Sequence, residues 1–175
     1  MSKKILISFL LICSVFALMG LIAYKALHKK AAADFPAEMP SWELITPEGG
    51  LFSSDSLGAG KIVILFYAPG CLFCEHEVRE LARHAADFSE NRLLFVTCAP
   101  VDSAAAYTLR TGIGTIPHYH SLIDTSLKIP LLLGIRTTPT TLLYDESRKL
   151  IQGFEGEVNA AKLLKTLRVY EAKEE

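Results

Sequence analysis

Cysteine is scarce in this sequence, with four residues in 175, and only Cys71 and Cys74 stand close together. A structural zinc site of four cysteines would need a second pair at similar spacing, and Cys13 and Cys98 are isolated. A bridge between Cys71 and Cys74 would close too short a loop to restrict the unfolded chain much. The missing second pair and the short loop both favour a chemical role for Cys71 and Cys74 over a structural one.

The sequence also lacks an excess of charge and any internal repeat. Its formal net charge of −1 gives no sign of a surface that binds nucleic acid. Half of the residues are hydrophobic, which in a chain of 175 residues is enough for one well-packed domain and an appendage.

The appendage lies at the N-terminus. A basic tail, residues 1–4, precedes the uncharged run 5–24, and about 20 apolar residues span a bilayer core of about 30 Å. We therefore expect a transmembrane anchor at 5–24, a linker at 25–39 and a folded domain at 40–175. The alanines 31–33 resemble a signal-peptidase site, but they lie behind a basic cluster, so we expect the anchor to remain uncleaved.

The cysteine pair lies where a strand is expected to meet a helix. The run Lys61–Tyr67 is apolar and favours a strand, and beyond Cys74 apolar residues recur at helical spacing. The helix start would place its free N–H groups and positive dipole end at Cys71, lowering the pKa of this thiol below about 8.5. Cys71 is thus the predicted nucleophile, and Cys74 is placed to resolve a mixed disulfide formed on Cys71.

Strands and helices alternate through the rest of the chain, which indicates a three-layer α/β sheet with one antiparallel edge. A short hairpin is expected at 42–52, before the first long strand. Further strands are expected at 92–97, 118–123, 140–144 and 149–154, and further helices at 102–109, 125–133 with an interruption at Pro130, and 158–170. Asp102 or Ser103 is the expected cap of the helix at 102–109.

This order of elements resembles the thioredoxin fold, and the anchor, leading hairpin and extra βα unit resemble the membrane-anchored TlpA/ResA-type thiol-disulfide oxidoreductases. The resemblance covers residues 39–170, and its motifs are Phe66-Tyr67-Ala68, Cys71-x-x-Cys74 and Thr138-Pro139-Thr140. It implies a thioredoxin-like sandwich with a central mixed sheet. It also implies a cis proline at Pro139 that faces the dithiol, with Thr138 and Pro139 binding the client protein.

Three features depart from thioredoxin itself. Gly70 replaces the tryptophan before the first cysteine, and Leu72-Phe73 replaces the usual Gly-Pro between the cysteines, so the redox potential cannot be carried over. Leu65 stands where thioredoxin has a buried aspartate. Glu77 instead matches a glutamate of the anchored reductases and could accept the proton of Cys74. The alternative is that Glu77 is a solvated helix charge.

The function implied is reduction of disulfides in secreted or periplasmic client proteins, for example in cytochrome c maturation, with electrons from an upstream membrane thiol donor. No bound cofactor or metal is expected. A disulfide oxidase or isomerase is an alternative, as is a copper or zinc module in which His118 or His120 joins Cys71 and Cys74. Peroxidase chemistry is disfavoured because no threonine stands in the few residues before either motif cysteine.

Lysines flank both ends of the expected anchor, with more on the C-terminal side, and taken alone this charge distribution would hold residues 25–30 in the cytoplasm. We expect the domain on the periplasmic or other extracytoplasmic side of the cytoplasmic membrane, because thioredoxin and glutathione keep thiols reduced inside the cell. Two further residues could lie near the site. We expect His76 to be an exposed helix residue and Cys98 to be a buried, inert thiol at the end of the neighbouring strand.

Overall fold

The structure is a computed structural model that describes residues 13, 19 and 34–174. The chain divides into two compact units, residues 1–32 and 33–175. The predicted anchor at 5–24 lies outside the described residues, apart from Cys13 and Met19, and so does the predicted basic tail. In the part that is described, no helix is long and apolar enough to cross a membrane.

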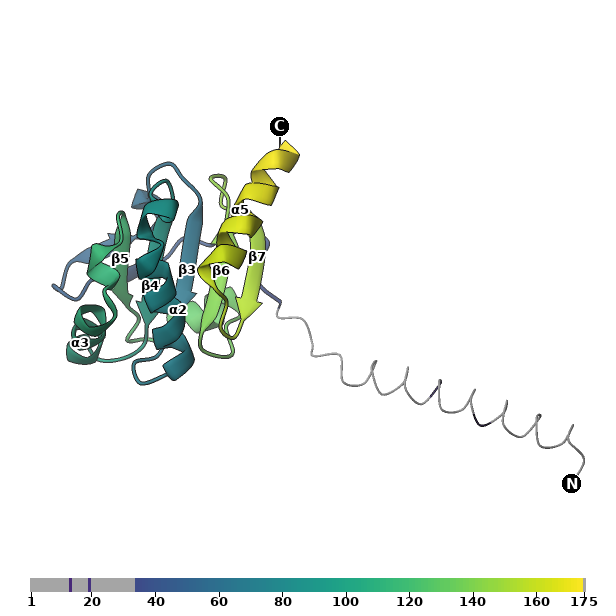
Figure 1. The fold of residues 1–175 in the computed structure, drawn as a ribbon. Coiled ribbons are helices and arrows are strands. Elements are labelled where there is room, and N and C mark those ends of the chain that lie inside the picture. The colour runs from purple at the N-terminus through teal and green to yellow at the C-terminus, as the bar shows by residue number, and fades with distance from the viewer. Residues whose placement is uncertain (1–12, 14–18, 20–33, 175) are drawn as a thin grey trace, which may run out of the picture. The chain divides into compact units, whose positions relative to one another are not determined.

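The domain is built on a seven-stranded mixed sheet with the order β2-β1-β5-β4-β3-β6-β7 (Figure 1). Strands β3, β4 and β5 are parallel, and the other strand pairs are antiparallel. The prediction of one antiparallel edge is therefore wrong, because the hairpin pairs with β5 and makes the second edge antiparallel too. The strands are β1 Glu43–Ile45, β2 Leu51–Ser53, β3 Ile62–Phe66, β4 Arg92–Thr97, β5 Tyr119–Ile123, β6 Thr140–Tyr144 and β7 Leu150–Glu155.

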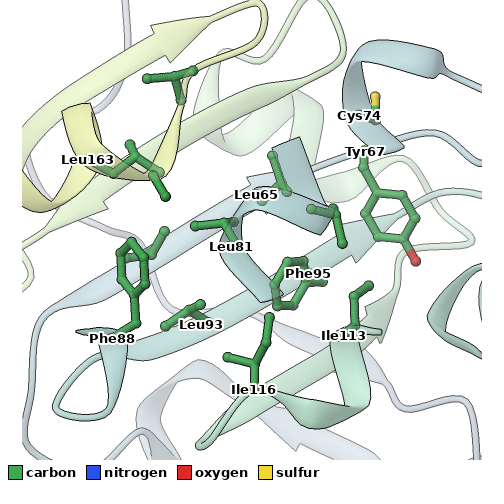
Figure 2. Packing of buried hydrophobic residues seen from close by; sticks show 14 of the residues in the cluster. Leu65, Tyr67, Cys74, Leu81, Phe88, Leu93, Phe95, Ile113, Ile116 and Leu163 are labelled. Carbon is green, nitrogen blue, oxygen red and sulfur yellow. The ribbon is translucent and has the colours of Figure 1, made fainter. Parts of the chain in front are cut away.

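Helices cover both faces of the sheet and give the expected three layers. The helices are α2 Leu72–Arg83, α3 Val101–Thr111, α4 Lys128–Leu133 and α5 Ala160–Glu174, with 3-10 turns η1 Ser54–Ser56, η2 Ala85–Phe88 and η3 Ile113–Thr115. Alternate residues of β3 point to opposite faces, so Leu65 packs with Leu81 of α2 and Leu163 of α5 (Figure 2). Ile64 packs instead with Ile129 of α4. Burial of both strand faces explains why the central strands are continuously apolar.

Helix α4 begins later than the predicted residue 125. The buried carboxylate of Asp124 accepts hydrogen bonds from the N–H groups of Ser126 at 3.3 Å and Ile129 at 2.6 Å, which holds the intervening residues in a turn. Pro130 therefore falls in the first turn, where proline replaces an N–H group that has no partner within the helix. It does not interrupt the helix.

Three other boundaries also differ from the prediction. Pro100, not Asp102 or Ser103, is the N-cap of α3. His118 has a φ of 53° and lies outside β5, so His118 and His120 are not two residues of one strand. The last helix starts after Asn159, whose side chain accepts a hydrogen bond from the Lys162 N–H at 2.8 Å.

Residues 34–39, which we call the N-terminal strap, pack against the domain although the prediction placed them in a linker. The backbone at Glu38 forms an isolated antiparallel β-bridge with Lys149, next to β7, with one backbone hydrogen bond on each side of the pair. Phe35 lies over Gly153 so closely that a Cβ atom at residue 153 would overlap the ring. Met39 is buried in the core. The folded domain therefore begins before residue 40.

Candidate active site

A tight turn places the first cysteine at the end of β3. The N–H of Cys71 donates to the carbonyl of Ala68 at 3.1 Å, and Pro69 and Gly70 are the two central residues of the turn. Gly70 has a φ of 90°, as the third residue of a type II turn requires. A side chain at residue 70 would meet no neighbour, so the backbone conformation explains this glycine.

Cys71 is the N-cap of α2 and forms a disulfide with Cys74. Its Sγ atom accepts a hydrogen bond from the Cys74 N–H at 3.2 Å. A sulfur in this position faces the unpaired N–H groups and the positive end of the helix dipole, and both stabilise a thiolate. Cys71 is partly exposed and Cys74 is fully buried. The two predicted roles require this difference in access.

Glu77 lies one turn beyond Cys74 on the buried side of α2, and no part of it is exposed. This rules out a solvated helix charge. Burial raises the pKa of the carboxyl to about 7, partly offset by two hydrogen bonds, and the charge of Glu157 raises it further. The carboxyl can therefore gain or lose a proton near neutral pH, and it lies on the same buried side of α2 as Cys74.

Two other elements hold the carboxyl of Glu77. The hydroxyl of Thr141 in β6 donates to its Oε1 atom at 2.5 Å, and the N–H of Val158 donates to its Oε2 atom at 3.2 Å. The residue before Val158, Glu157, also contacts the exposed ring of His76. Helix α2 is thereby linked to the loop before α5 through two adjacent residues. The expectation of an exposed His76 is confirmed.

The Thr138–Pro139 peptide bond is cis, as the resemblance implied. Pro139 is buried, and its carbonyl accepts a hydrogen bond from the N–H of Gly156 at 2.8 Å. Thr140 closes the loop by donating from its hydroxyl to the Thr137 carbonyl at 2.8 Å. No backbone hydrogen bond joins Thr138 to any other described residue. Thr138 therefore has backbone groups left for a bound chain.

A pocket of about 630 Å³, which we call the α4 pocket, opens where the ends of β3 and β4 meet α4. Cys98 lies in its wall as a free, partly exposed thiol, with its sulfur 3.9 Å from a carboxylate oxygen of Asp124. Burial and the charge of Asp124 raise the pKa of Cys98 to about 11. This thiol is therefore protonated at neutral pH, although it is less buried than predicted.

The two histidines proposed as metal ligands lie at the wrong end of the sheet. In the parallel strands, Tyr119 pairs with Leu93 near the start of β4, whereas the cysteines follow the end of β3. The ring of His120 packs against Phe52 in a tilted arrangement with ring centroids 4.5 Å apart, and burial lowers the pKa of His120. Among residues 34–174, no group of three or more potential ligands could hold a metal ion.

The sequence identified Cys71, Cys74, Glu77 and the Thr138–Pro139 pair, and the structure places them at the same end of the sheet. It missed Thr141, the Val158 N–H and the α4 pocket. A signal for Thr141 did exist. Two threonines open an otherwise apolar buried strand directly after a proline, and buried hydroxyls need a partner. The Val158 contact has no such signal, because it comes from a backbone group.

The AhpC/TSA family matches residues 35–163 of the chain. No curated protein sequence matches it significantly.

Solved structures with a similar fold include three from bacteria. Peroxidoxin BcpB from Mycobacterium tuberculosis is 22% identical with a TM-score of 0.66, and the match covers 77% of this chain and 96% of that chain. DsbF of MTB is 20% identical with a TM-score of 0.66, covering 77% and 98%. The exposed lipoprotein thioredoxin of Streptococcus pneumoniae is 21% identical with a TM-score of 0.60, covering 74% and 98%. These likenesses show a thioredoxin-like fold with a mixed sheet.

Proposed function

Because the chain belongs to the AhpC/TSA family and is a thiol-disulfide oxidoreductase, we propose that it reduces disulfides in client proteins through Cys71 and Cys74. The observation that carries this proposal is the unequal access of the two sulfurs. Cys71 caps α2 at the surface, and Cys74 is buried one turn further along. An outer sulfur can meet a protein disulfide, and an inner sulfur can only attack what is already bound to the outer one.

The proposed reaction has two exchange steps. The Cys71 thiolate attacks one sulfur of the client disulfide, forming a mixed disulfide and releasing the other client sulfur as a thiolate. The Cys74 thiolate then attacks the sulfur of Cys71, forming the Cys71–Cys74 disulfide and releasing the second client thiolate. Two electrons pass from the protein to the client, and the two client thiolates take up protons. The disulfide described above is the oxidised product of this cycle.

Glu77 is the proposed proton acceptor for Cys74. A buried thiol must lose its proton before it can attack, and Leu65 leaves no carboxylate in β3 to accept it. No hydrogen bond joins the carboxyl of Glu77 to Cys74, so we place one water molecule between them. A carboxyl with a pKa of about 7 can accept a proton during client reduction and return it when the enzyme is reduced again.

Thr138 and Pro139 are the proposed client contacts. The Pro139 carbonyl is already bonded to Gly156, which leaves the backbone of Thr138 to pair with an extended client chain. Thr138 also lines the α4 pocket, so a chain paired with it would lie along that opening.

We further propose a TlpA/ResA-type arrangement, with residues 5–24 as a membrane anchor and the domain on the extracytoplasmic side. The apolar run in the sequence supports the anchor. The clients would then be secreted or periplasmic proteins, such as apocytochrome c, and an upstream membrane thiol donor would supply the electrons. The opposite direction of electron flow would make the same site an oxidase, and exchange of client disulfides without net electron flow would make it an isomerase.

The test is to trap the mixed disulfide. Cys74→Ser removes the resolving sulfur, so client proteins should accumulate on Cys71 as adducts that a reductant releases and mass spectrometry identifies. Cys71→Ser should form no such adducts. Adducts that persist in Cys71→Ser would contradict the assignment. Stoichiometric zinc retained at neutral pH, without reduction of insulin, would favour the metal-binding alternative.

A further inference from the structure

The α4 pocket has apolar walls. Phe66 from β3, Pro130 from α4 and Ile135 from the following loop line it, and Leu127 at its edge is 57% exposed. A volume of about 630 Å³ is enough for two or three amino-acid side chains, within the usual range for ligand sites. The pocket can therefore take an apolar segment of a bound chain.

The pocket also extends to both the turn before Cys71 and the loop that holds the cis proline. Ala68 and Pro69, which line it, belong to the turn that ends at Cys71, and Thr138 lines it on the other side. Leu72, directly after Cys71, is 80% exposed and extends the apolar surface around the sulfur. A chain seated in the pocket would thus pass close to the attacking atom.

Arg136 is the only charged residue among the described residues that line the pocket, and it is exposed. No carboxylate in the described part of the chain forms an ion pair with it. Four other arginines of the domain do form ion pairs: Arg79 and Arg110 with Glu75, Arg83 with Glu80, and Arg148 with Asp55. The Arg136 cation at the α4 pocket is therefore available to an anionic group from outside.

We propose that the α4 pocket binds an extended client segment that is apolar next to its cysteine and carries an acidic side chain for Arg136. The inference rests on the proposed function and narrows its substrates to one class. An exposed ion pair of this kind contributes modestly to binding and is weakened by salt. It acts mainly by selecting among clients and by fixing the direction of the bound chain.

The experiment compares three peptides that differ in one side chain. Each peptide has leucine beside its cysteine, and Asp, Asn or Lys three residues away. The cysteine is held as a mixed disulfide with 2-thiopyridine, a neutral leaving group. When Cys71 of the reduced full-length protein attacks the peptide sulfur, pyridine-2-thione is released and its absorbance gives the rate. The variants are Arg136→Gln and Arg136→Glu, with Arg168→Glu as a control of equal charge change on α5.

The wild type should react with the Asp peptide about two- to fivefold faster than with the Lys peptide, with Asn between them. Arg136→Gln should abolish the ranking, Arg136→Glu should reverse it, and Arg168→Glu should preserve it. High salt should flatten the wild-type ranking.

An unchanged ranking in Arg136→Glu, or equal rates for the three peptides, would overturn the inference and leave the proposed function standing. The inference also fails if Arg136→Glu instead abolishes self-association or binding to phosphatidylglycerol vesicles, since the occupant would then be a second copy or a lipid surface. If no peptide reacts, the role of Cys71 fails and the inference fails with it.

Discussion

A thiol lies near a buried carboxylate at the carboxyl end of the sheet on each of its two faces. On the α2 face, Cys74 and Glu77 are both fully buried, and Cys74 has a second cysteine within reach. On the α4 face, Cys98 lies beside Asp124 and has no cysteine partner among the described residues. The residue types are nearly the same, so the surroundings must account for different behaviour.

The difference lies in what each carboxylate is bonded to. Asp124 accepts three hydrogen bonds from Ser126 and Ile129, which commits it to shaping the start of α4. Burial, together with the charge of Asp124, raises the pKa of Cys98 and keeps this thiol protonated. Glu77 accepts two hydrogen bonds from distant elements and titrates at about 7. One face thus has a carboxylate held by hydrogen bonds in the turn before α4, and the other has a carboxyl that can move a proton.

The strongest way to break this comparison is to remove the charge of each carboxylate in turn. Glu77→Gln should slow the resolution of the Cys71 mixed disulfide about a hundredfold, because general base catalysis typically contributes this much or more. Asp124→Asn should change the rate little, because the amide oxygen of asparagine can still accept a hydrogen bond from the Ile129 N–H. Rapid-quench measurement of the mixed disulfide gives both rates. Glu80→Gln is the matched control. Equal rates for Glu80→Gln and Glu77→Gln would mean that water or His76, and not Glu77, accepts the proton of Cys74.

The pH dependence of stability sharpens the comparison further. The pKa of Glu77 is raised from 4.5 to about 7 by folding, so its effect on stability is favourable below pH 4.5 and is lost as the pH rises to about 7. At about 1.4 kcal/mol per pH unit, the free energy of unfolding should fall by about 3 kcal/mol across this pH range. Urea unfolding of the oxidised protein should show this loss in the wild type and in Glu80→Gln. A wild type that parallels Glu77→Gln would mean that the carboxyl is not shifted.

Alkylation of the reduced protein compares the thiols directly. At pH 7, iodoacetamide should modify Cys71 more than about tenfold faster than Cys98, because only Cys71 lies at a helix N-terminus and Cys98 has a pKa of about 11. Cys74 should be shielded by its burial. Peptide mapping after timed labelling gives the three rates. Faster labelling of Cys74 than of Cys71 would reverse the assigned roles.

The smallest expected effect concerns the hydrogen bond from Thr141. Thr141→Val removes a donor that favours the ionised carboxylate, so the pKa of Glu77 should rise by about one pH unit. Infrared titration of the carboxyl measures this shift without any client. Thr141→Ser should restore the wild-type value. Thr111→Val removes another buried hydroxyl, which is bonded to the Tyr107 carbonyl, and should leave the titration unchanged.

Local patterns were sufficient to predict most of the fold. The apolar runs of β3, β4 and β6 and the helical spacing beyond Cys74 reflect burial, which acts on each segment separately. The start of α4 was misplaced because one side chain, Asp124, decides where the helix can begin. The sequence favours a linker at the strap because Pro36 and the small Ala37 favour extended chain, whereas its contacts depend on Gly153, more than a hundred residues later.

The same distinction applies to the site. The spacing of Cys71, Cys74 and Glu77 along one helix places them on neighbouring turns without knowledge of the fold. Arg136 and Cys98 come together only through the packing of α4 against the strand ends. The sequence therefore predicts the groups proposed to react, and it gives no sign of the surface proposed to select their substrate.

The N-terminal strap also determines how the domain would respond to a pull from the preceding chain. The strap is held by the Phe35 contact with Gly153 and by two backbone hydrogen bonds that flank the Glu38–Lys149 bridge. Tension applied before residue 34 would load these few contacts first and would peel the strap from β7. The parallel strands that carry the dithiol lie further from the point of attachment in the sheet order. The backbone of Asp34 also packs against Gly134, the C-cap of α4 directly before the pocket residue Ile135, so a mechanical load would reach α4 before it reached those strands.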